Sequence, residues 1–456
     1  MATTKERISG LRMILHNYYN TEVHMVDEEL SILEKPTCIE LTAQFRKGGQ
    51  SNLETLACFV KLCEFDTGIT INIDQLTGFK KEVDFYRFVI PALTKYQKRQ
   101  KIASGSHYYY LFPKCIGATV SILCDREVPD ETGALVLENI KEMGYRVPDE
   151  NLDMKSCKLV LSQMARMHAA PLAMKLVSLE EYKAQVVPYL LNTCYRKTPY
   201  RHFDARTLTA DVLQMYDLSD SISSTDAVIE YSKSITDLNI IEDDTWFTLC
   251  HSDFTIRNLM MTYDLRGNPQ GCKIIDWKCY SYSHCCDDLL LFLFTSVEIP
   301  VLIECYSSLL DYYYTQLIYQ LKKYRVGKKI GPYTKARFLG EVHMQGQKLL
   351  AQIVQALAYI TCEGYKENGE PILGPLFRTS FLLELITILP TLIFWSSEHI
   401  KLSLKFRKIR SVFSKIKINR CFTLTMNKKN KHNMKSKRIE LGYQKMKNTV
   451  IVRVGK

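Results

Sequence analysis

The sequence contains no Cys-x-x-Cys pair, although it has fifteen cysteines. An odd number of scattered thiols does not suit a disulfide framework and fits a reducing compartment better. We therefore expect a cytoplasmic location. The adjacent Cys285 and Cys286 are interpreted as small packing residues, with metal or redox chemistry as the alternative.

A long uninterrupted hydrophobic run is also missing. The N-terminal sequence MATTKERISGLRM lacks the apolar core of a signal peptide. The most apolar stretch, Phe381–Trp395, is too short to cross a membrane, and it contains Glu384 and Pro390. We predict no transmembrane segment and interpret this stretch as a buried helix.

Acidic residues are scarce at the C-terminal end. From Lys401 onward there are 18 lysines and arginines and a single acid, Glu440, whereas the rest of the chain is mildly acidic. We predict that residues 401–456 form a disordered basic tail. A patch that touches anionic membrane surfaces and an arm that binds nucleic acid are the alternatives, because both act through charge alone.

The most informative stretch covers residues 248–295. It contains His251, Asp253 and Asn258 in the spacing H-x-D-x-x-x-x-N. Asp276 closes the apolar run CKIID, and the sequence DLRGNP between two short apolar runs predicts a hairpin turn. The expected order is strand, loop, strand, turn and strand, with an aspartate at the end.

This order of residues predicts phosphoryl transfer. One carboxylate must accept the proton of the attacking hydroxyl, while an amide and a second carboxylate hold Mg²⁺ on the phosphates. Asp253 is the predicted base, and His251 is the residue that fixes the loop. Asn258 and Asp276 are the predicted metal ligands. A purely structural His-Asp loop between strands is the alternative.

The block resembles the kinase-like small-molecule phosphotransferases of the aminoglycoside and choline kinase superfamily, which share an H-G-D-x-x-x-x-N loop. Within that group it is most similar to the insect ecdysteroid-kinase-like (CHK-type) family. Ser252 replaces the loop glycine, and Thr255 and Arg257 replace the expected Trp and Asn. The family's Asp-Leu-Leu position falls on Asp288, with Asp287 as a register alternative, and implies an aspartate that braces the catalytic loop.

The resemblance extends to the nucleotide side. Lys61 lies in the strand-like run ETLACFVKLCEF, and Glu82 follows 21 positions later in a long amphipathic stretch. They match the strand lysine and helix glutamate whose ion pair holds the lysine against the phosphates. Glu138 and Asn139 match the hinge where adenine meets backbone groups. A surface lysine and a solvated glutamate are the alternative for the first pair.

Glycine is missing where this family has it. A glycine-containing turn between the first two strands covers the phosphates with backbone N–H groups. Here no glycine occurs between Gly10 and Gly48. Gly48 and Gly49 precede the lysine strand, one turn too late for that role. We expect either a shortened first hairpin or a degenerate nucleotide cover.

The resemblance implies an α+β, two-lobed protein-kinase-like fold, with a small antiparallel β N-lobe that carries one helix and a mostly α-helical C-lobe. We expect a helical leader at residues 1–35, the N-lobe at 36–139, the C-lobe at 140–400 and the tail at 401–456. His168, at a helix end, is interpreted as a packed core residue. The run Tyr312-Tyr313-Tyr314 either faces an acceptor or packs in the core.

The reaction implied is ATP-dependent phosphorylation of a hydroxyl on a small molecule, with ATP and Mg²⁺ as cofactors. By resemblance the acceptor is a steroid-like alcohol such as an ecdysteroid, and no specific nucleic-acid partner is expected. Because the glycine turn is missing, a pseudokinase-type binding module on the same fold is the first alternative. An unrelated helical scaffold whose basic tail binds polyanions is the second.

Overall fold

The computed structural model describes residues 11–32, 37–49, 51–63, 73–121, 128–190, 204–215, 226, 229–230, 244–365 and 371–374. These residues belong to one compact unit. None of the helices in these ranges combines the length and the hydrophobicity that a membrane crossing requires. The predicted helix at Phe381–Trp395 and the basic tail lie outside the described residues.

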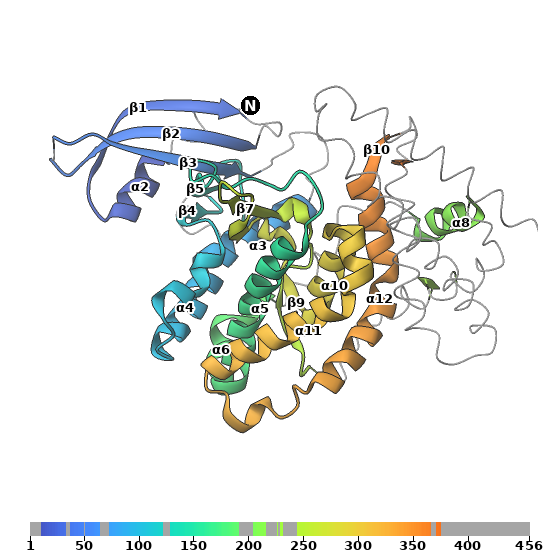
Figure 1. Cartoon of the computed structure of the whole chain (residues 1–456). Helices are drawn as coiled ribbons and strands as arrows, with labels where there is room; N and C mark the ends of the chain where they lie inside the picture. The colour runs from blue at the N-terminus through green and yellow to red at the C-terminus, as the bar shows by residue number, and fades with distance from the viewer. Residues whose placement is uncertain are drawn as a thin grey trace, which may run out of the picture. The chain divides into compact units, whose positions relative to one another are not determined.

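The N-terminal part forms a five-stranded antiparallel sheet with the spatial order β1-β2-β3-β5-β4 (Figure 1). Its strands are β1 (Val23–Ile32), β2 (Cys38–Lys47), β3 (Glu54–Leu62), β4 (Cys115–Thr119) and β5 (Ala134–Glu138). Every second residue of β2 is buried, because successive side chains of a strand point to opposite faces. The buried face shares its core with the helix α2 (Leu11–Tyr19), which contributes Ile14 and Leu15.

The helical leader predicted for residues 1–35 is wrong for its second half. Among the described residues of this segment, Leu11–Tyr19 is helical but Val23–Ile32 forms strand β1. This strand pairs along its whole length with β2. Pairing with a partner strand therefore determines the conformation of Val23–Ile32, and helix α2 ends before it.

The first hairpin is not shortened. β1 and β2 pair from Val23 opposite Lys47 to Ile32 opposite Ile39. The missing glycine led us to expect either a shortened first hairpin or a degenerate nucleotide cover, and the shortened hairpin is wrong. The two strands pair fully, and the sequence that connects them contains no glycine. Gly48 and Gly49 occupy the next turn with φ of +37° and +73°, a backbone region that glycine enters at little cost.

One helical run follows the first three strands of the sheet in the chain. It consists of α3 (Ile73–Asp84), the π-helical turn η1 (Phe85–Val89) and α4 (Ile90–Arg99). The stretch is amphipathic, and the apolar residues Phe79, Val83, Tyr86 and Ile90 are buried. A π-helical turn inside a helix is rare and often accompanies a functional site. Here it carries Phe85, which packs against the catalytic region.

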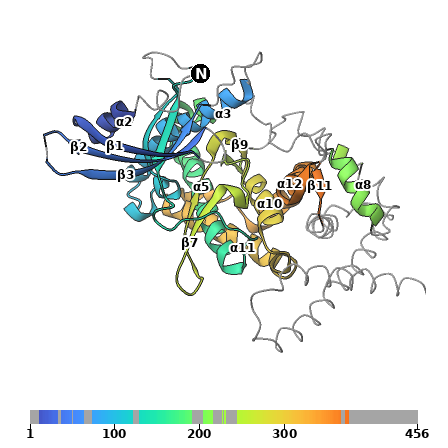
Figure 2. The same ribbon diagram turned by 90° about the horizontal axis from the view of Figure 1, so that it is seen from above.

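The C-terminal part is mostly helical. Its long helices are α5 (Met154–Val177), α10 (Cys285–Ser296), α11 (Ile299–Lys323) and α12 (Lys335–Thr361). Helix α11 packs along α5, and α12 packs along α10 (Figures 1 and 2). The shorter helices are α6 (Leu179–Gln185), α7 (Val187–Leu190) and α8 (Ala205–Met215). Sheet and helices together confirm the predicted α+β, two-lobed protein-kinase-like class.

Short antiparallel strand pairs carry the catalytic block. They are β6 (Phe247–Cys250) with β9 (Ser281–His284), and β7 (Leu259–Tyr263) with β8 (Pro269–Ile274). A third pair, β10 (Cys362–Tyr365) with β11 (Pro371–Leu373), follows α12. The predicted hairpin is confirmed, because Asp264 N donates to Asn268 O across the turn that joins β7 and β8. This hairpin brings residue 258, just before β7, close to residue 276, just after β8.

Candidate active site

His251 links the loop that follows β6 to the end of β8. Its ring is fully buried. Nδ1 lies 3.3 Å from the backbone nitrogen of Asp253 and accepts its N–H. The ring proton is therefore on Nε2, which donates to Ile275 O at 2.9 Å. The histidine thus fixes the start of the loop against the residue that precedes Asp276, in the position expected of a scaffold residue.

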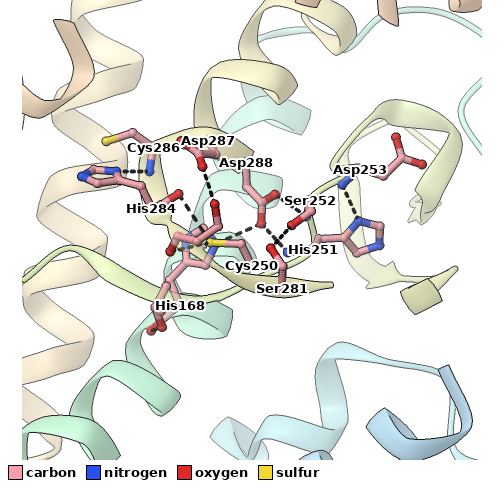
Figure 3. A network of polar contacts seen from close by, with 12 residues as sticks. His168, Cys250, His251, Ser252, Asp253, Ser281, His284, Cys286, Asp287 and Asp288 are labelled. Atoms are coloured by element: carbon pink, nitrogen blue, oxygen red, sulfur yellow. Dashed lines mark hydrogen bonds and ion pairs between the residues drawn. The ribbon is translucent and has the colours of Figure 1, made fainter. Parts of the chain in front are cut away.

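Asp288 lies in the first turn of α10, and its carboxylate accepts hydrogen bonds from the loop backbone (Figure 3). Its Oδ2 accepts the N–H of His251 at 2.6 Å, and its Oδ1 accepts the N–H of Ser252 at 2.8 Å. The carboxylate is fully buried. Asp287, the register alternative, accepts a hydrogen bond from Ser283 Oγ instead. Of the two aspartates, Asp288 is therefore the one that braces the loop.

His168 is a buried core residue of α5, and it also contacts the brace. Its Nε2 lies 3.2 Å from Asp288 Oδ2, and its Nδ1 lies 2.7 Å from the hydroxyl of Tyr313. The helix continues beyond His168 to Val177 rather than ending there. The sequence pattern indicated its burial but gave no signal for the contact with Asp288, because the two residues are 120 positions apart.

The loop departs from the family pattern at three positions, and the structure shows where each side chain goes. Ser252 replaces glycine at φ +65°, in the left-handed region, and its Oγ lies 2.7 Å from Ser281 Oγ. Thr255 is buried. Arg257 leaves the loop, and its guanidinium donates to Ile360 O on α12 at 3.0 Å. Asp288 binds the loop backbone despite these replacements.

Asp253 and Asn258 face one another across the loop. The amide nitrogen of Asn258 donates to the backbone oxygen of Asp253 at 2.7 Å and to its Oδ2 at 3.0 Å. Both side chains are more than nine-tenths buried. Since the amide NH₂ points at Asp253, the amide oxygen of Asn258 points elsewhere, and within the described part of the chain no donor reaches it.

Asp276 joins the two parts of the fold. Its Oδ1 accepts a hydrogen bond from Lys61 Nζ at 2.7 Å, and the same ammonium contacts Glu82 Oε2 at 2.5 Å. Glu82 also accepts the N–H of Trp277 at 3.1 Å. Asp276 has φ of +62°, a strained conformation for a non-glycine residue that is typical of functional sites. The structure brings Lys61, Glu82 and Asp276 together, as the resemblance implied.

Lys278 is a site residue that the sequence reasoning missed. Its Nζ lies 2.6 Å from Asp276 Oδ2, the carboxylate oxygen that Lys61 does not bind. Burial alone raises the pKa of Asp276, but the ammonium groups of Lys61 and Lys278 outweigh it and hold the pKa well below its usual value. Conversely, burial disfavours the charged form of both lysines, and the carboxylates outweigh it and raise the pKa of each.

Aromatic rings connect α3 and η1 to the catalytic loop. Trp277 stacks on Phe85, with the ring centroids 3.9 Å apart and the planes 5° apart. It also contacts the ring of His251 edge to face, with the ring centroids 4.7 Å apart. Lys81, next to Glu82, donates to Tyr280 O at 2.5 Å from a buried position. Burial lowers the pKa of Lys81 to about 8.

The predicted hinge residues lie at the end of β5. The N–H of Glu138 donates to Lys114 O, and that of Asn139 donates to Ala57 O. Both backbone donors are therefore used within the protein. The N–H of Ile140 has no hydrogen-bond acceptor among the described residues. The sequence did not indicate this candidate donor, because it depends on the path of the backbone after the end of β5.

The donor set fits a hard divalent cation. Asn258 offers an amide oxygen without a hydrogen-bond donor among the described residues, and Asp276 offers a carboxylate. Mg²⁺ prefers such oxygen ligands. The backbone N–H of Ile275 donates to Asn258 O at 3.0 Å, so the two candidate ligands flank the same end of the β7–β8 hairpin.

Cys285 and Cys286 are both fully buried at the start of α10. Together with His284 they place three potential ligand atoms within 4.8 Å of one another. His284 precedes the first turn of α10, and its Nδ1 accepts the N–H of Cys286 at 3.1 Å. Metal binding through Nδ1 would therefore require this hydrogen bond to break. Tyr313 is buried in the core, and Tyr312 and Tyr314 are half-buried.

The fold is that of the protein-kinase-like class. The chain belongs to the ecdysteroid kinase-like family, whose model matches residues 37–326. Two solved structures of spectinomycin phosphotransferase, APH(9)-Ia, are similar to it, each with a TM-score of 0.34. The complex with ADP and spectinomycin has 14% identity and is matched over 82% of this chain and 97% of its own. The AMP complex has 15% identity and is matched over 81% and 97%. No curated protein matches.

Proposed function

We propose that the protein is an ATP-dependent kinase that transfers the γ-phosphate to a hydroxyl of a small molecule. The observation that carries this proposal is the position of Lys61, whose ammonium contacts Glu82 and Asp276 at the same time. A cation in this position can bind nucleotide phosphates, and an aspartate beside it can bind their metal ion, which supports the proposal. The proposed base Asp253 and the amide of Asn258 lie in the loop that His251 connects to the end of β8 by a hydrogen bond.

Each residue has a separate role in the proposed reaction. Asp253 accepts the proton of the attacking hydroxyl, and the amide of Asn258 holds that carboxylate at 3.0 Å. Lys61 binds the nucleotide phosphates, and Glu82 fixes Lys61. Asn258 and Asp276 hold Mg²⁺, which when bound neutralises charge on the phosphates. Little covalent work is left to the protein, so positioning and charge supply the rate enhancement.

Adenine lies against the end of β5 in this proposal. The N–H groups of Glu138 and Asn139 are already used, so the hinge acts through other backbone groups. The N–H of Ile140 supplies the donor, since no described residue accepts it. Glu138 keeps a structural role, because its Oε1 also accepts the N–H of Lys114 at 2.8 Å.

The family's name supports a steroid-like alcohol of the ecdysteroid type as the acceptor. We propose this class as the first to test, with choline-like and sugar alcohols as comparison acceptors. A screen with labelled ATP measures phosphate transfer to each class. Transfer to none of them, under conditions where the protein binds Mg-ATP, would contradict the proposed reaction.

A binding module without transferase activity is the second candidate function. The glycine-free connection between β1 and β2 favours it, because a glycine turn normally lets the backbone approach the phosphates. A thermal-shift titration with Mg-ATP tests nucleotide binding. A ligand at 100 times its Kd stabilises the native state by about 2.7 kcal/mol. A melting temperature that rises in the wild type and not in Asp276→Ala supports the metal assignment, whereas no rise in the wild type supports a module that does not bind Mg-ATP.

A further inference from the structure

The two oxygens of Asp276 have different cations. Lys61 contacts Oδ1 at 2.7 Å, and Lys278 contacts Oδ2 at 2.6 Å. Two ammonium groups this close to the carboxylate oppose the approach of a divalent ion, because like charges repel. Moving one of the two lysines away therefore favours metal binding at Asp276.

Lys61 is the lysine that stays. It is held by two carboxylates from different elements, because Glu82 on α3 contacts it at 2.5 Å. Glu82 is itself fixed, since it accepts the N–H of Trp277 and its side chain is 3% exposed. Moving Lys61 would leave Glu82 as a buried unpaired charge, which is costly.

Lys278 is the lysine that can leave. Within the described part of the chain, Asp276 is its sole hydrogen-bonding or ion-pairing partner. It lies two residues beyond Asp276 in the short 3-10 turn η7 (Trp277–Cys279), and its side chain is 29% exposed. A partly exposed, flexible lysine reaches water or a phosphate oxygen by rotating its own side chain, with no change of the backbone.

We infer that Lys278 is a built-in competitor for the metal ion at Asp276, and that nucleotide phosphates release it. In the free protein its ammonium occupies Oδ2 and opposes metal binding. When a nucleotide enters, the phosphates offer the ammonium new acceptors, and Oδ2 becomes available to the cation. Metal binding thereby becomes conditional on the nucleotide. This inference rests on the proposed function, because it takes Asp276 as the metal ligand.

The test compares the full-length wild type with Lys278→Gln and Lys278→Arg. Binding of Mn²⁺ alone is followed by the electron paramagnetic resonance signal of the free ion. Removing a positive charge next to the metal position strengthens Mn²⁺ binding in Lys278→Gln by roughly tenfold. Lys278→Arg keeps the charge and stays close to the wild type. Lys335→Gln, which removes a lysine paired with Asp311 on the exposed surface, is the matched control and leaves the affinity unchanged.

A second measurement follows ADP binding in the presence of EDTA, where no metal contributes. Here the inference predicts the opposite sign, with Lys278→Gln binding ADP several-fold more weakly than the wild type because a phosphate partner is lost. An unchanged Mn²⁺ affinity or an unchanged metal-free ADP affinity in Lys278→Gln would overturn the inference. A mere loss of fold weakens both ligands together, so opposite changes exclude it.

Asp276→Asn separates this inference from the proposed function. If Asp276→Asn removes Mn²⁺ binding in the presence of ADP but Lys278→Gln does not strengthen Mn²⁺ binding alone, the metal site stands and the role of Lys278 fails. If Asp276→Asn leaves Mn²⁺ binding in the presence of ADP intact, the metal assignment itself fails, and with it both proposals.

Discussion

The two sides of the site are held in different ways. On the base side, the catalytic loop is fixed by hydrogen bonds from backbone N–H groups to the buried carboxylate of Asp288, and by the ring of His251. On the metal side, Asp276 is fixed by the ammonium groups of Lys61 and Lys278. The first set of contacts involves no group that a ligand would replace, whereas the second set consists of charges that the proposed metal and nucleotide would rearrange. In the proposed reaction the base side is therefore preorganised, and the metal side responds to ligands.

The largest effect expected on the base side is that of Asp253→Asn on turnover. The substitution removes the proton acceptor, and Asn258 still has an oxygen at residue 253 to bond, so the loop keeps its shape. General-base catalysis contributes about 10²–10⁴-fold, and we expect a fall of that size in kcat. Single-turnover phosphate transfer measures it, with Mg-ATP affinity as the control. Equal turnover in this variant would remove Asp253 from the base role.

Asp288→Ala is expected to have the largest effect on stability. It leaves the N–H groups of His251 and Ser252 buried without an acceptor, and it removes a partner of His168. A buried donor left without an acceptor costs about 1–3 kcal/mol, so the two N–H groups together predict a loss of about 2–6 kcal/mol, which urea denaturation measures. The neighbouring Asp287→Ala is the control, because Asp287 is less buried and accepts from a single serine hydroxyl. Equal losses in the two variants would contradict the assignment of the brace to Asp288.

On the metal side, Lys81 makes stability depend on pH. Burial lowers its pKa to about 8 in the folded protein, against 10.5 for an ordinary lysine. Between these pH values the unfolded chain binds more protons than the folded protein, so stability rises with pH, by about 1.4 kcal/mol per unit, and the rise ends near pH 10.5. Below pH 8 both states are protonated and this contribution is constant.

Lys81→Met removes this dependence. The free energy of unfolding of the wild type minus that of the variant is therefore expected to be flat from pH 6 to about 8 and to rise from about 8 to 10.5. Urea denaturation at a series of pH values gives both curves, and the subtraction cancels the groups that the two proteins share. Parallel curves over the whole range would show that Lys81 is not the group responsible.

The contrast between the two sides also explains what the sequence predicted. On the base side the spacing from His251 to Asn258 and the hairpin turn are local, so the loop could be predicted from neighbouring residues. The same holds for the strand of Lys61 and the helix of Glu82, where the resemblance supplied the pairing. The expected roles in catalysis and nucleotide binding stay predictions.

What the sequence could not supply depends on contacts between distant segments. Nothing in the sequence distinguishes Lys278 from a lysine on the protein surface. Its contact with Asp276 Oδ2 depends on the backbone conformation of Asp276. The contact of His168 with Asp288 spans 120 positions, and strand β1 was missed because its partner β2 determines it. Burial of Lys81 requires Tyr280, which lies 199 positions further along the chain.

The smallest effect is expected for Ser252→Gly, which restores the residue type of the family. Glycine relieves the cost of φ +65°, about 1–2 kcal/mol. It also loses the hydroxyl contact with Ser281, worth about 1 kcal/mol, and adds freedom to the unfolded chain. These terms oppose one another, so we expect a change in stability within about 1 kcal/mol and little change in kcat. Ser252→Val, with a β-branched side chain at the same φ, should lose more than Ser252→Gly in urea denaturation. If valine were tolerated as well as glycine, the loop backbone would not be held at this conformation. That result would contradict the proposal that the base side is preorganised.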